Sequence, residues 1–194
     1  MRLSNMIMYI RYYAKNIRLH VIRKFKGLDF EGRVYDGNPQ LNGYEGCYPV
    51  KRILRKLKIS NRDSILDIGC GKGLFVYYAG KFGFARIDGL EYSNELFNIA
   101  KSNMAKVDDA RIHLYNCDAR EFGDYADYSH FFLCNPFSSE VMEIVLSKIL
   151  ESRKENMRKI TIYYQFPFYG DLILDKGFEL RYGNFLHGVF VLDG

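Results

Sequence analysis

Residues 65–73 read ILDIGCGKG, and this stretch decides the fold. A short apolar run leads into a turn with glycine at every second position, and the apolar, helix-favouring residues 74–82 follow. Glycine adopts positive φ angles without penalty and lets a ligand approach the backbone, while the next helix offers free N–H groups and a positive dipole end. The stretch therefore predicts a strand, a glycine-rich loop and a helix, with a nucleotide-like ligand at the loop.

The details of the loop distinguish three kinds of ligand. A P-loop needs Ser or Thr after its lysine to hold Mg²⁺, whereas Lys72 is followed by Gly73 and Leu74. A dinucleotide loop reads Gly-x-Gly-x-x-Gly, whereas this loop reads Gly-x-Gly-x-Gly with Asp67 two residues ahead of it. A buried carboxylate repels a pyrophosphate and suits positive charge. We therefore expect S-adenosylmethionine, with its sulfonium and amino groups, rather than NAD.

Three further segments follow in order, ARIDGLE (85–91), NCDAR (116–120) and FFLCNPF (131–137). Together with the glycine loop they resemble the motifs of class I S-adenosylmethionine-dependent methyltransferases, and the resemblance covers residues 50–194. It implies that Glu91, 22 positions after Gly69, accepts the ribose hydroxyl protons. It also implies that Asp118 binds the adenine amino group.

The resemblance gives the following set of candidate residues. The expected cofactor-binding residues are Asp67, Gly69, Cys70, Gly71, Gly73, Glu91, Tyr92, Asp118, Ala119 and Asn135. The expected catalytic residues, at the mouth of the methyl-transfer pocket, are Asn135, Pro136 and Phe137. Tyr163, Tyr164 and Gln165 are further candidates for the substrate wall, although strand composition explains them equally well.

Asn135-Pro136-Phe137 is one proline shorter than the Asn-Pro-Pro-aromatic motif of amino-methyltransferases. The expected function is methyl transfer to an unidentified acceptor, such as a nitrogen on RNA, protein or a small molecule. Because the same residues can simply turn a strand into a helix capped by Ser138 or Ser139, a non-catalytic S-adenosylmethionine-binding module acting through a basic helix is the alternative. A nicotinamide-dependent reductase is a third hypothesis.

The N-terminal segment carries the positive charge of the chain. Residues 1–28 hold seven Lys or Arg and no acid, which leaves 21 bases against 23 acids in the remainder. Apolar residues recur there at helical spacing, so the segment predicts a basic amphipathic helix. Its longest apolar run, Met6 to Ile10, is too short for a transmembrane segment. Residues 2–26 can contact RNA or another polyanion, anionic lipid, or their own domain.

Composition sets the remaining expectations. A chain of 194 residues suits one globular unit, and we divide it into an N-terminal helix with a Gly/Tyr-rich lid loop (1–48) and a catalytic domain (49–194). The resemblance to methyltransferases implies that this loop folds over the cofactor as a lid, in which Tyr44 and Tyr48 face the substrate; equally, they can simply pack on the surface. The four cysteines and four histidines are scattered, which predicts neither a disulfide framework nor a metal site and favours a reducing, cytoplasmic location.

From Pro49 onward, the periodicity of apolar residues alternates between helix and strand. We expect helices at 50–57, 73–82, 93–106, 138–151 and 168–176, and strands at 64–69, 85–90, 111–116, 129–134, 159–166, 178–183 and 186–192. This order predicts an α/β fold: a Rossmann-like, mostly parallel sheet of seven strands with an antiparallel edge hairpin and helices on both faces.

Overall fold

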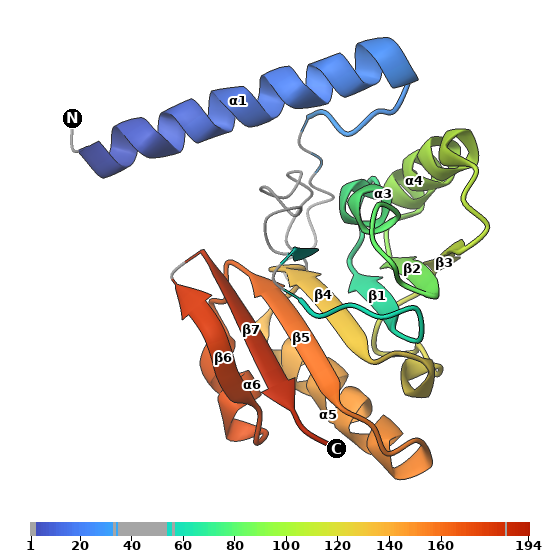
Figure 1. Ribbon diagram of the computed structural model, residues 1–194, viewed down its shortest axis with the longest axis vertical. Helices are drawn as coiled ribbons and strands as arrows, with labels where there is room; N and C mark the ends of the chain where they lie inside the picture. The colour runs from blue at the N-terminus through green and yellow to red at the C-terminus, as the bar shows by residue number, and fades with distance from the viewer. Residues whose placement is uncertain (1–2, 33, 35–53, 56, 185) are drawn as a thin grey trace.

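The computed structural model describes the backbone of residues 3–12 and the whole of residues 13–32, 34, 54–55, 57–184 and 186–194. A single seven-stranded sheet with the order β3-β2-β1-β4-β5-β7-β6 forms its centre (Figure 1). The strands are β1 (Ser64–Ile68), β2 (Arg86–Glu91), β3 (Ile112–Asn116), β4 (His130–Cys134), β5 (Ile160–Gln165), β6 (Glu179–Asn184) and β7 (His187–Leu192).

The strand directions confirm the expected sheet. β1 runs parallel to β2 and β4, and the β2–β3 and β4–β5 pairs are also parallel. β7 is antiparallel to both β5 and β6 and lies between them, so the C-terminal hairpin forms one edge. The chain therefore has the mostly parallel, Rossmann-like architecture that the alternating pattern predicts.

Helices cover both faces of this sheet. They are α3 (Leu74–Ala79), α4 (Asn94–Val107), α5 (Ser139–Glu155) and α6 (Gly170–Asp175), together with a 3-10 turn η1 (Tyr125–Asp127). Helix α1 (Leu3–Lys26) lies beyond the end of the sheet (Figure 1). α3 is shorter than expected because the chain turns at Gly80. The expected helix at 50–57 and the lid residues Tyr44 and Tyr48 lie largely or wholly outside the described residues. Within those residues, no helix has the length and apolar character needed to cross a bilayer.

Alternating side chains divide the apolar core into two layers. Ile65 packs on the α3 side of the sheet, whereas its neighbour Leu66 packs on the α5 side. On the α3 side the rings of Phe75, Phe132 and Tyr163 stack in a row, with centroids 3.7 and 5.4 Å apart. This period of two is what a strand buried on both faces requires.

The residues that follow α1 are bound directly to the sheet domain. Leu28 and Phe30 are buried in the α3-side core. Asn103, which is 1% exposed, accepts a hydrogen bond from the Asp29 N–H (2.8 Å) and donates to the carbonyls of Asp29 (2.9 Å) and Lys72 (3.0 Å). Lys72 Nζ in turn donates to the Glu31 carbonyl at 2.5 Å. This set of contacts, the Asn103–Lys72 latch, joins the N-terminal segment to the glycine loop.

We predict that Asn103→Ala lowers the free energy of unfolding by about 2–4 kcal/mol, because it leaves one buried and two part-buried backbone groups without this partner. Urea unfolding followed by circular dichroism measures this change. Asn98→Ala, at an exposed position on the same helix, is the matched control and should stay within about 0.5 kcal/mol of the parent chain. Equal stability of the two variants would show that the latch contributes nothing.

Candidate active site

The loops that follow β1 and β4 meet at the carboxyl edge of the sheet. β2 lies on one side of β1 and β4 lies on the other. The strand order therefore reverses between β1 and β4, and the two loops lie at this reversal. Gly69 has φ +78°, and a Cβ placed there would stand 2.6 Å from Cβ of Pro136. Glycine is therefore required at position 69 for both its backbone angle and its close contact. Ligands of open α/β sheets bind at this switch point.

The glycine loop uses its own N–H groups to hold β2. The N–H groups of Gly69 and Cys70 donate to the Leu90 carbonyl at 2.8 and 2.9 Å, and the Gly71 N–H donates to Glu91 Oε2 at 2.8 Å. These three loop N–H groups are already bonded within the protein, whereas the sequence predicted free N–H groups at the start of the helix that follows. The loop is consequently poorly suited to cradle a pyrophosphate.

Close packing holds the remaining loop residues in place. Gly71 and Gly73 have φ angles of +55° and +81°, which glycine adopts readily. A Cβ at Gly73 would lie 3.3 Å from Cε of Met104 in α4. Cys70 is buried, and its Sγ would lie 2.9 Å from a Cβ at Gly89. Burial also raises the pKa of the Cys70 thiol, which disfavours the reactive thiolate form.

Glu91 lies at the end of β2 in a defined orientation. Its side chain is 8% exposed, and Oε1 accepts a hydrogen bond from the Ser93 N–H at 2.8 Å while Oε2 accepts from Gly71. Each carboxylate oxygen can accept a second hydrogen bond, so the group can also accept from hydroxyl donors. The ring of the next residue, Tyr92, is exposed beside it. Asn116 supports this corner by donating to the Glu91 and Tyr92 carbonyls.

Asp67 adds a second buried carboxylate to this corner. It is 3% exposed, and its strand neighbours in register are Gly89 and Phe132. Burial raises the pKa of Asp67 well above its ordinary value, and the negative charge of Glu91 raises it further. A cation bound beside Asp67 would favour the ionised form of that carboxyl, so the two carboxyl groups together fit a ligand with a cationic centre. The residues present therefore fit S-adenosylmethionine.

The loop after β3 carries Asp118 and Ala119. Both Asp118 oxygens accept hydrogen bonds from Arg120, with 2.8 Å from its backbone N–H to Oδ1 and 2.6 Å from Nη2 to Oδ2. These bonds lower the pKa of Asp118, which stays ionised. Ala119 is buried, and its carbonyl accepts a hydrogen bond from the Tyr125 hydroxyl at 2.8 Å. An adenine amino group must therefore share Asp118 with Arg120.

The ends of β4 and β5 hold the candidate catalytic group. Asn135 has φ +48°, in the left-handed region, and its Oδ1 accepts a hydrogen bond from the Tyr164 hydroxyl at 3.3 Å. Phe137 is 4% exposed and belongs to the α5-side core. Gln165 ends β5 beside Cys134 and is 2% exposed, and its Oε1 has no hydrogen-bond partner among the described residues. This buried oxygen is available to a bound donor.

Sequence reasoning missed two features of the site. The first is the Asn103–Lys72 latch, whose only signal was a lysine inside the glycine loop. The second is Arg120, which appears in the NCDAR segment but was given no role. Among the described residues, no group of three or more His, Cys, Asp or Glu side chains could hold a metal ion.

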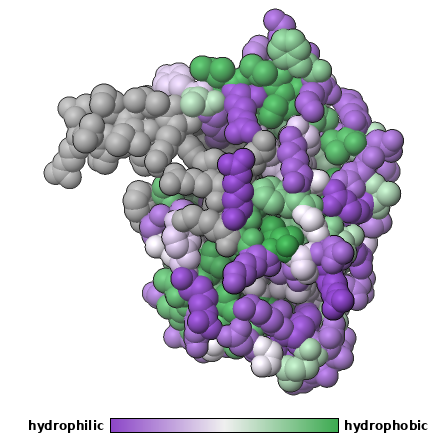
Figure 2. Space-filling view, in the orientation of Figure 1, coloured by the Kyte–Doolittle hydropathy of each residue, from purple (hydrophilic) through white to green (hydrophobic). Residues whose placement is uncertain are grey.

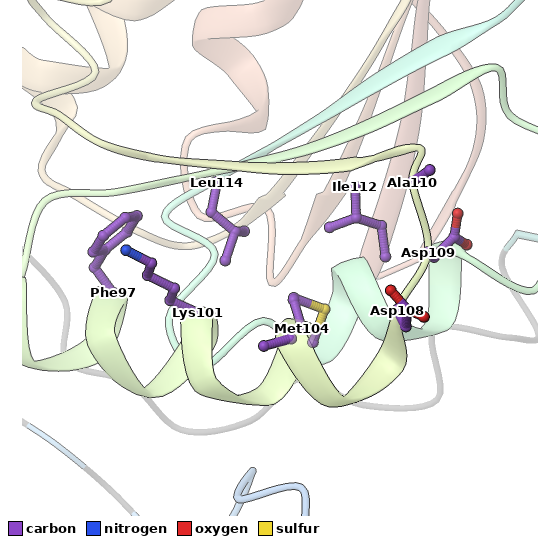
Figure 3. Close-up of a pocket in the computed structure, with 9 residues that line it drawn as sticks. Phe97, Lys101, Met104, Asp108, Asp109, Ala110, Ile112 and Leu114 are labelled. Atoms are coloured by element: carbon purple, nitrogen blue, oxygen red, sulfur yellow. The ribbon is translucent and has the colours of Figure 1, made fainter.

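A cavity of about 390 Å³ lies elsewhere, between α4 and β3 (Figure 3). Phe97, Lys101 and Met104 line it from the helix, and Ile112 and Leu114 line it from the strand. None of the candidate site residues lines this cavity. We therefore place the site at the carboxyl edge of the sheet, where the buried carboxylates lie, and not in this cavity.

Comparisons with known proteins agree with this geometry. Residues 65–156 match the family model described as a methyltransferase domain. The chain is 28% identical over 120 residues to EEF1A lysine methyltransferase 2 of Homo sapiens, which covers 61% of this chain and 50% of that protein. It is 30% identical over 93 residues to the Mus musculus protein of the same name, covering 48% of this chain and 36% of that protein. The chain thus spans half or less of these curated relatives.

Solved structures show the same fold. A SAM-dependent methyltransferase from Aquifex aeolicus superposes with a TM-score of 0.58 at 13% identity, covering 75% of this chain and 89% of that one. The ribosomal protein L11 methylase from Lactobacillus delbrueckii subsp. bulgaricus gives 0.56 at 14% identity, with coverage of 74% and 76%. The matched segment 65–156 contains the glycine loop, Glu91 and Asn135, so the part of the chain that is similar to a methyltransferase domain is the part that builds this site.

Proposed function

We propose that this chain transfers a methyl group from S-adenosylmethionine to the ε-amino group of a protein lysine. The buried carboxylate of Asp67 beside Glu91 is the observation that carries the proposal. Asp67 attracts the positive charge of the cofactor, and Glu91 accepts hydrogen bonds from its ribose. Tyr92, Asp118 and Ala119 provide the adenine side. When bound, the cofactor supplies an electrophilic methyl group on a sulfonium.

The acceptor side rests on two uncharged amide oxygens. Register places the end of β4 beside the end of β5, so Asn135 and Gln165 lie on neighbouring strand ends. Asn135 Oδ1 and Gln165 Oε1 would accept N–H bonds from a neutral amine and leave its lone pair free for in-line attack. The nitrogen gains the methyl group, the bonding pair of the broken C–S bond stays on sulfur, and the methylated amine releases one proton to solvent.

Lysine is favoured over other nitrogen acceptors for two reasons. Both curated relatives are named as lysine methyltransferases. A lysine amine must also lose its proton before it can attack, and burial lowers a lysine pKa because it disfavours the charged form. Phe132 and Tyr163, which precede Asn135 and Gln165 on β4 and β5, are each 1% exposed and stack on one another, so these strand ends adjoin an apolar layer. RNA as an acceptor and a cytoplasmic location stay predictions.

One observation favours the non-catalytic alternative. The ring of Phe137 is buried in the α5-side core, whereas the Asn-Pro-Pro-aromatic motif uses its ring to stack on a planar acceptor. A lysine amine offers no planar group for an aromatic ring to stack on. The absence of a stacking ring at this position is therefore compatible with lysine methylation. The loop N–H groups bonded to β2 argue against the third hypothesis, a nicotinamide-dependent reductase.

We predict that Asp67→Asn weakens S-adenosylmethionine binding by about 1–3 kcal/mol while it stabilises the ligand-free protein at neutral pH. The pKa of Asp67 is raised on folding, so its ionisation lowers stability as pH rises above the ordinary carboxyl range. Binding of a cation needs the ionised form, so affinity of the parent chain should rise with pH over the same range.

Calorimetric titration and thermal unfolding across pH measure both effects. Asp175→Asn, an exposed carboxylate on α6, is the matched control and should change neither quantity. Parent-like affinity in Asp67→Asn would remove this residue from the binding site.

We predict that Asn135→Gly lowers kcat at least about 100-fold with a smaller effect on cofactor affinity, because glycine keeps the left-handed backbone but removes the amide oxygen. Gln165→Leu should retain the fold, since it replaces a buried oxygen that has no partner, and should lower kcat/KM for the amine. Asn98→Ala again serves as the control.

The assay uses radiolabelled S-adenosylmethionine with three acceptor pools: native proteins, the same proteins with acetylated lysines, and RNA. Label on the first pool alone supports the proposal. Label on RNA would support methyltransferase activity but contradict lysine as the acceptor. Cofactor binding with no label on any pool would favour the non-catalytic module.

A further inference from the structure

Helix α1 presents apolar side chains on two opposite faces. One face carries Leu19, which is 4% exposed and packs into the α3-side core together with Ile22. The other face carries Ile17, Val21 and Phe25, which are 65%, 46% and 77% exposed. Because these three residues recur at intervals of four, they form a single line along the helix, which we call the outer stripe.

The outer stripe lies among basic residues. Residues 1–28 contain no acid. Arg18 lies over the Tyr78 ring of the domain, 5.1 Å from its centroid, whereas Lys24 lies beside the stripe residue Phe25. Lys24 Nζ lies 5.9 Å from the centroid of the Phe25 ring. Of the two acids in the following segment, Asp29 is paired with Lys72 at 3.3 Å and Glu31 with Arg23 at 2.9 Å. Along the upper edge of Figure 2, where the described half of α1 lies, green and purple atoms are exposed side by side.

We propose that the outer stripe binds an anionic phospholipid bilayer, with α1 lying in the plane of the membrane surface. A helix with an apolar face flanked by Lys and Arg inserts its apolar side chains at the headgroup boundary while its cations attract anionic lipid. This proposal does not depend on the identity of the methyl acceptor.

Two other occupants fit the stripe less well. An RNA would satisfy the cations through its phosphates but would leave Ile17 and Val21 without a partner. A second copy of the chain, paired through the same stripe, would bring two acid-free basic helices together, and like charges repel. A bilayer alone satisfies both the apolar and the cationic groups.

Membrane binding would hold the methyl-transfer site near the lipid surface. α1 lies at the end of the molecule toward which β4 and β5 run (Figure 1). The segment after α1 is bonded to Lys72 of the glycine loop through Asp29 and Glu31. The helix that would contact lipid is therefore joined directly to the cofactor loop.

Co-sedimentation of the full chain with vesicles tests the proposal. One set of vesicles is phosphatidylcholine, and the other is an equimolar mixture of phosphatidylcholine and phosphatidylglycerol. We expect binding to the mixed vesicles, and the triple variant Ile17→Gln/Val21→Gln/Phe25→Gln should lower the partition coefficient about tenfold or more with its charge unchanged. Lys24→Gln should weaken binding to the mixed vesicles only.

The matched control is Ile144→Gln/Met157→Gln, which changes two exposed apolar residues (43% and 71% exposed) away from α1 and should bind vesicles like the parent chain. S-adenosylmethionine binding verifies that each variant is folded. Equal vesicle binding by the triple variant and the parent would overturn the proposal. An absence of vesicle binding by the parent chain would also overturn it. In that case, salt-dependent binding to RNA would indicate a nucleic-acid partner, and a dimer that the triple variant dissociates would indicate a second copy of the chain.

Discussion

A carboxylate buried at the centre of a parallel sheet, Asp67, is the constraint on which the rest of this structure depends. An ionised group at 3% exposure is unfavourable without a compensating charge, and Glu91 nearby makes it more so. In the ligand-free protein, burial and the charge of Glu91 therefore favour the protonated form of Asp67 at the point where the strand order reverses. A ligand that carries positive charge interacts most favourably with such a site. The buried carboxyl group therefore favours a cationic cofactor.

The glycine loop follows from the same constraint. Its N–H groups turn toward β2 and bond Leu90 and Glu91, so they hold the second carboxylate in place instead of facing an anion. The close contact between Gly69 and Pro136 then joins the cofactor side of the site to Asn135. A change at either loop is therefore expected to affect both cofactor binding and the acceptor side.

The sequence predicted the sheet because strands buried on both faces and a glycine-rich turn leave strong local signals. All seven strands were placed within one or two residues of their observed bounds, including the edge pair β6 and β7. Contacts between distant residues left no such signal. Asn103 meets Asp29 across 74 positions, and neither residue belongs to a recognisable motif. The burial of Phe137 likewise depends on how α5 packs, which periodicity does not specify.

Calorimetry of S-adenosylmethionine binding in buffers of different ionisation enthalpy tests the central claim most directly. Near pH 6 the amino group of the free cofactor is fully protonated, because an α-amino pKa is about 7.7–8.0. If a cation binds beside Asp67, the raised pKa of that carboxyl falls on binding and the complex releases protons, whereas Asp67→Asn releases none. Equal proton release by the parent and the variant, or none by either, would contradict the account.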